Sequence, residues 1–117
     1  MSEASRIETL KHLLDRKISP PEANIILSRF DFDSEPLVEV ERSHILKLLM
    51  DFIEGFIDSK DVEDWADAVE LRDDLFYDPQ YEEDMKDIVH DLSNPILSGP
   101  LTNDKALEMI SVLQRDI

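Results

Sequence analysis

One histidine has a spacing that could bind a metal ion. Glu83, Asp87 and His90 follow one another at intervals of four and three residues, so a helix through this segment would place them on one face. Helical di-metal proteins use a carboxylate three positions before a histidine, with one such pair on each of two helices. Here Asp87-x-x-His90 is the single pair, and Glu63 or Glu70 would have to complete a site. A metal-binding or catalytic helical protein is thus one hypothesis, with no metal and no other cofactor assigned.

The sequence lacks the other common motifs of catalysis or ion binding. The acidic residues after Phe30 begin like a calcium loop, but Pro36 stands where that loop needs glycine and Arg42 where it needs glutamate. The chain has two glycines and no cysteine, so a phosphate-binding glycine loop and a thiolate nucleophile are excluded. Its serines and histidines are too scattered to suggest a triad. We therefore predict that the protein is not an enzyme and has no catalytic residue.

Carboxylates are concentrated in one third of the chain. The net charge is −16, and residues 58–91 hold fourteen acidic residues against three basic ones. Four of the acidic residues recur with helical spacing along a helix that we predict over residues 60–74: Glu63, Asp67, Glu70 and Asp74. Like charges four positions apart on a helix cost roughly 0.2–0.5 kcal/mol per pair. A sequence optimised for stability alone would have placed lysines between them.

A second acidic row and two tyrosines follow this helix. Asp84 and Asp87 lie on the next predicted helix, while Tyr77 and Tyr81 flank the loop between the two helices. Tyrosine is a common anchor of interfaces because it combines a large apolar area with a polar tip. We therefore predict one partner-binding surface with these members: Glu63, Asp67, Glu70, Asp74, Tyr77, Tyr81, Asp84 and Asp87. The alternative is that the acidic rows are only the solvated backs of amphipathic helices.

Apolar residues recur with a helical period along the whole chain, which predicts an all-α fold. We expect a single domain over residues 1–117, built as a compact antiparallel bundle of five to six helices. The start signals are Ser19 followed by Pro20, Asp58 or Ser59, and Thr102. The predicted helices span about 3–17, 20–30, 40–56, 60–74, 79–92 and 103–115, with loops at 31–40 and 93–101. Trp65 is expected in the core.

Charge and composition also restrict the partners. A net charge of −16 repels phosphate backbones and anionic lipid surfaces, so we predict no nucleic-acid and no membrane partner. The same charge attracts a basic protein. No basic start precedes an apolar run at the N-terminus, and no apolar stretch approaches the ~20 residues that span a bilayer. A cytoplasmic protein is the expectation.

Two stretches suggest a family. The first is Phe52-x-x-Gly55-x-Ile57 followed by Val62-x-x-Trp65-Ala66, and the second joins His90-Asp91-Leu92-Ser93-Asn94-Pro95 to Gly99-Pro100-Leu101-Thr102. With the small size and the strong acidity, they resemble the helical immunity proteins of bacterial toxin systems, notably the colicin D-type class. The resemblance spans about residues 45–115. It implies an inhibitor that covers the basic cleft of a nuclease toxin with acidic side chains, and it would make the predicted surface the toxin-facing one. A structural homodimer is a further hypothesis.

Overall fold

Helices form most of the structure, a computed structural model that describes residues 3–30, 35–70 and 72–114. This part of the chain contains α1 (Glu3–Leu14), α2 (Pro20–Leu27), β1 (Val38–Val40), α3 (Arg42–Ile53), α4 (Ser59–Val69), β2 (Leu75–Tyr77), α5 (Glu82–Ser93), α6 (Pro95–Ser98) and α7 (Asn103–Leu113). The prediction of a mainly helical fold is therefore confirmed. Seven helices are described, against the five to six predicted, because the 93–101 connector contains α6.

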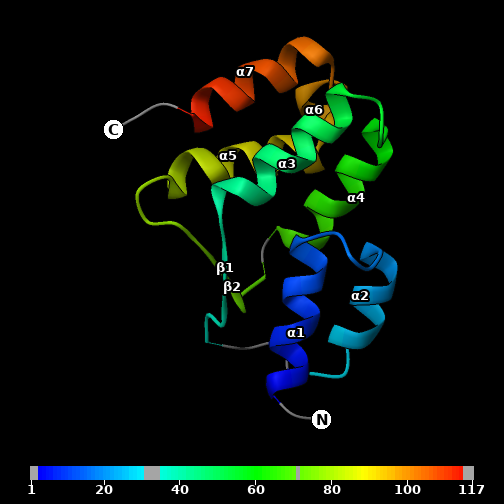
Figure 1. The fold of residues 1–117 in the computed structure, drawn as a ribbon, viewed down its shortest axis with the longest axis vertical. Coiled ribbons are helices and arrows are strands. Elements are labelled where there is room, and N and C mark those ends of the chain that lie inside the picture. The colour runs from blue at the N-terminus through cyan, green and yellow to red at the C-terminus, as the bar shows by residue number, and fades with distance from the viewer. Residues whose placement is uncertain (1–2, 31–34, 71, 115–117) are drawn as a thin grey trace.

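The all-α prediction is wrong at one place, where two short strands pair. β1 and β2 run parallel, with Val38 opposite Leu75 and Val40 opposite Tyr77. We predicted a loop for the first segment and a helix end before the second. Except for Glu39, the strand residues are β-branched, aromatic or apolar, types that suit a half-buried sheet. Parallel strands need a long crossover connection, and α3 and α4 provide it here (Figure 1).

The helix starts were better predicted than the helix ends. The side chains of Ser19, Asp58 and Thr102 each accept a hydrogen bond from the backbone N–H three residues later, as N-caps do. Pro20 is the first residue of α2, a position at which the missing N–H costs nothing. In contrast, α4 ends at Val69, five residues before the predicted end. This early end decides where the acidic residues after it point.

Buried aliphatic side chains and one tryptophan hold the helices together. Trp65 is 1% exposed, and its Nε1–H donates to the backbone carbonyl of Leu13 at 3.1 Å, which ties α4 to α1. The core position predicted for Trp65 is thus confirmed. α4 packs against α5, and α7 packs against both α3 and α5. Figure 1 shows α3, α5 and α7 near one end of the long axis, with α1 and α2 at the other. Within the described ranges, no helix is long and apolar enough to cross a bilayer.

Candidate functional site

Asp74, predicted as the last member of an outward stripe, points into the protein. Its side chain is 1% exposed. Arg72 donates to it twice at 2.9 Å, and the Nε of Arg6 donates to Oδ2 at 3.1 Å. Burial by itself would raise the pKa of Asp74, but the hydrogen bonds and charges of Arg72 and Arg6 outweigh it and lower that pKa. The outward prediction is wrong because the helix ends at Val69 and the chain turns into β2.

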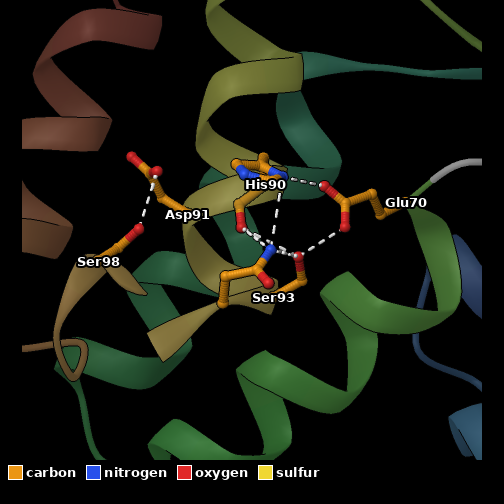
Figure 2. Close-up of polar contacts among 6 residues, drawn as sticks. Glu70, His90, Asp91, Ser93 and Ser98 are labelled. Atoms are coloured by element: carbon orange, nitrogen blue, oxygen red, sulfur yellow. Dashed lines mark hydrogen bonds and ion pairs between the residues drawn. The ribbon is translucent and has the colours of Figure 1, made fainter. Parts of the chain in front are cut away.

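Glu70 also has an intramolecular role. It follows the last residue of α4, and its carboxylate reaches the C-terminal end of α5 (Figure 2). Oε2 lies 2.8 Å from Nδ1 of His90, and Oε1 accepts a hydrogen bond from the Ser93 hydroxyl at 2.8 Å. The Asn94 amide donates to Ser93 Oγ at 2.9 Å and to the His90 carbonyl at 2.8 Å. Glu70 therefore links α4 to α5.

The Glu70, His90 and Ser93 side chains are the types of a catalytic triad, but their connections differ. In a triad, the hydroxyl gives its proton to the imidazole, which the carboxylate orients from its other side. Here the single proton of the Ser93 hydroxyl is shared between two acceptors, Glu70 Oε1 at 2.8 Å and the His90 backbone carbonyl at 3.0 Å. The imidazole thus contacts the carboxylate and is not placed to take the proton of Ser93. This arrangement is a connection between helix ends.

Three carboxylates of α4 lie close together. Within the part of the chain that the structure describes, Glu63, Asp64 and Asp67 form the one group whose possible ligand atoms all lie within 4.8 Å of one another. The α5 residues of the metal hypothesis do not form such a group. Lys60 occupies one side of the cluster, with its Nζ 3.5 Å from Glu63 and 3.1 Å from Asp64. Burial and then the charges of Glu63 and Asp64 raise the pKa of Asp67.

The two tyrosines are less accessible than expected of interface anchors. Tyr81 is 6% exposed, and the guanidinium carbon of Arg42 lies 3.8 Å from its ring centroid, so its ring helps to pack α3 against the start of α5. Tyr77 is half-buried. Burial, and then the charge of Glu70, raises the pKa of Tyr77 to about 12. Phe76, between Leu75 and Tyr77 in β2, is 39% exposed because strand alternation turns its side chain to the opposite face from theirs.

The acidic residues that do point outward border a groove that sequence reasoning missed. The groove has a volume of about 490 Å³ and lies between α4, α5 and α7, with α6 and residues 99–101 at its edge. Its acidic lining residues are Glu63, Asp84, Asp87, Asp91 and Glu108. Its apolar lining residues are Val62, Ile88, Leu92, Leu101, Met109 and Val112. The apolar period of residues 103–115 predicted a helix and the side that faces the core. It did not indicate that Glu108 and Met109 lie beside the acidic helices. We call this feature the acidic groove.

Two lysines line the acidic groove, and both are already held. Lys60 contacts α4 carboxylates, as above, and Lys105 Nζ donates to the Ser98 carbonyl at 2.8 Å. Asp91 accepts a hydrogen bond from the Ser98 hydroxyl at 3.1 Å (Figure 2). Asp87 is exposed, and no ion pair within the described residues reaches it. Among the described residues that line the groove, five acidic side chains thus outnumber two lysines.

No family model, curated protein or solved structure matches the chain. Its function must therefore be inferred from its own residues. The predicted surface separates into two parts. Asp74 and Tyr81 are buried and Glu70 links two helices, whereas Glu63, Asp84 and Asp87 line the acidic groove and Asp67 is exposed on α4.

Proposed function

We propose that the protein binds a basic protein and masks its charged surface, most concretely as an immunity-type inhibitor of a nuclease toxin. The observation that carries the proposal is the acidic groove, in which five carboxylates lie beside two lysines that are already held. A nuclease binds phosphates with lysines and arginines, so its cleft is positively charged. The acidic groove carries negative charge, as does the nucleic-acid substrate that such a cleft binds. The resemblance to colicin D-type immunity proteins supports the same function.

Long-range attraction favours this function over simple solubility. At physiological salt the field of exposed charges extends about 8 Å, and a field of one sign raises the rate at which an oppositely charged protein associates. Solubility needs net charge but no particular place for it. Here fourteen of the 28 acidic residues fall in residues 58–91. Asp67 also lies beside Glu63 and Asp64, although burial and then the charges of these two carboxylates raise its pKa.

The test begins with tagged protein incubated with a lysate of its native host, at low and at physiological salt. The retained basic protein is then purified, and its association rate is measured by stopped-flow or surface plasmon resonance. The double variant Asp67→Lys with Asp87→Lys reverses two exposed charges at or beside the groove. The control Glu3→Lys with Glu8→Lys changes the net charge equally, on exposed positions of α1.

We expect the groove variant to lower the association rate about tenfold or more, and the control to lower it far less. If the captured protein is a nuclease, the wild-type chain should inhibit it and the groove variant should require more protein for the same inhibition. Equal effects of the two double variants would mean that net charge alone matters. If neither double variant changes the association rate, the acidic surface does not contribute to binding and is only a solvated face.

A further inference from the structure

The acidic groove combines two surfaces that charge masking alone does not require. Its rim carries carboxylates, whereas six of its lining residues are apolar. The neighbouring α6 also exposes apolar side chains, which do not line the groove. Pro95 and Ser98 of α6 line the groove, and the two residues between them, Ile96 and Leu97, are 97% and 80% exposed. An occupant would therefore have to offer apolar side chains as well as positive charge.

We propose that the acidic groove binds an amphipathic, cationic helix of the basic partner. This proposal rests on the proposed function and specifies which part of the partner is bound. The apolar side of such a helix would lie against Met109, Leu101 and their apolar neighbours. Its lysines and arginines would lie against the carboxylates of α5, among them Asp87. This is the helix-in-groove mode, in which anchors recur at positions i, i+3, i+4 and i+7.

The surroundings of the groove favour a helix over an extended peptide. A peptide that binds as a strand needs an exposed sheet edge, and none of the groove-lining residues belongs to β1 or β2. The walls are instead α5 and α7, of 12 and 11 residues. At 1.5 Å per residue these walls are about 17–18 Å long, which matches a partner helix of about three turns.

The carboxylates of the rim favour a cationic helix over the other ligands that an apolar groove could bind. A second copy of this chain would bring a net charge of −16 to a rim that is itself acidic. A nucleic acid would meet the same repulsion. Small-molecule sites are typically enclosed around a few convergent polar groups. In this groove Asp87, Asp91 and Glu108 are exposed and spread along the rim. A cationic helix complements both the apolar lining and the rim.

Two synthetic peptides of equal length and equal lysine, leucine and alanine content test the proposal. One places its leucines at i, i+3, i+4 and i+7, and the other has the same residues in an order without an apolar face. Binding to the full chain is measured by fluorescence anisotropy and mapped by amide chemical shifts. Burial of even one additional leucine strengthens binding about tenfold, so we expect at least that difference between the peptides. The largest shifts should fall on groove residues of α5 and α7.

A matched pair of variants separates the groove from the rest of α7. Met109→Gln keeps the side-chain volume but makes the lining polar, whereas Leu107→Gln changes a 53% exposed side chain that does not line the groove. We expect Met109→Gln to weaken binding of the amphipathic peptide about fivefold or more without affecting binding of the other peptide. Leu107→Gln should change the binding of neither peptide. Ser59→Trp, at an exposed lining position, blocks the groove without altering Met109 and should weaken the same peptide.

The outcomes distinguish this proposal from the broader one. Equal binding of the two peptides, with a loss for both in Asp87→Lys, would overturn the helix proposal and leave charge masking intact. Amphipathic-peptide binding that survives both Met109→Gln and Ser59→Trp would also overturn it. If neither peptide binds and the lysate yields no basic partner, both proposals fail.

Discussion

Replacement of Asp74 by alanine should remove a connection that holds α1 near the second strand. The carboxylate is 1% exposed and accepts hydrogen bonds from Arg6 and Arg72. Loss of one partner of a buried ion pair costs about 3–5 kcal/mol, because the remaining charge stays buried. Arg72 is 22% exposed and can regain water, and Arg6 keeps its contact with the Phe30 ring. We therefore expect the lower end, about 3 kcal/mol, or about 10–15 °C in Tm for a chain of this size.

Urea and thermal unfolding followed by circular dichroism measure this loss. Asp73→Ala is the matched control, because it removes the same charge from the adjacent, exposed position and should change stability by less than about 0.5 kcal/mol. The double variant Arg6→Met with Asp74→Ala should recover part of the loss, since the buried guanidinium that donates to Asp74 is then removed together with its acceptor. The reasoning is refuted if Asp74→Ala costs no more than Asp73→Ala.

The dependence of this loss on pH follows from the lowered pKa of Asp74. A carboxyl group whose pKa is lower in the folded state stabilises the fold above its unfolded pKa of about 3.9, and this contribution disappears as the pH falls through the folded pKa. The difference in unfolding free energy between wild type and Asp74→Ala should thus stay constant from pH 7 to about pH 5. Below about pH 4 it should shrink. A difference that stays constant down to pH 2 would show that the charge of Asp74 does not matter.

Three further predictions address single positions. Gly99→Ala should cost about 1–3 kcal/mol in urea unfolding, because Gly99 has φ +87° and ψ 159° and an added Cβ would lie 2.7 Å from Lys105 Nζ. Asp67→Asn should raise stability by roughly 0.2–0.5 kcal/mol while slowing association with the proposed basic partner, and a loss of stability would contradict the repulsion with Glu63. Ultraviolet titration should show one tyrosine that ionises at about pH 12 and should lose this step in Tyr77→Phe; its persistence in the variant would refute the assignment.

Features that depend on near neighbours in the chain were predictable from the sequence. The caps at Ser19, Asp58 and Thr102 act over three residues, so side-chain type and spacing identify them. The core position of Trp65 follows from the helical period of its apolar neighbours. The mainly helical fold was predictable for the same reason.

Features that depend on distant segments were not. The pairing of Val38–Val40 with Leu75–Tyr77 joins short segments separated by two helices, and neither is long enough to show a strand period. Asp74 continued the spacing of the α4 carboxylates, but α4 ends at Val69, so that period no longer applied. The acidic groove needs α7 beside α5, and no local pattern in residues 103–113 indicates this neighbour. Prediction therefore failed where tertiary contacts decide the outcome.

Four of the six arginines have partners away from the lining of the acidic groove. Arg6 and Arg72 pair with Asp74, Arg16 pairs with Asp51, and Arg42 lies over a tyrosine ring and donates to the Leu113 carbonyl. None of these four arginines is among the described residues that line the acidic groove.

Neutralisation of that rim would have been structurally simple. One turn of helix suffices to place a lysine against a carboxylate, as Lys86 does with Glu82 at 2.8 Å. A lysine four residues after Asp87 would form the same kind of ion pair without changing the core. The chain instead has His90 three residues after Asp87 and Asp91 four residues after it. A surface that is easy to neutralise, lies around an apolar groove and remains acidic is better explained by a cationic ligand than by solubility. A uniform spread of the same charge would have sufficed for solubility.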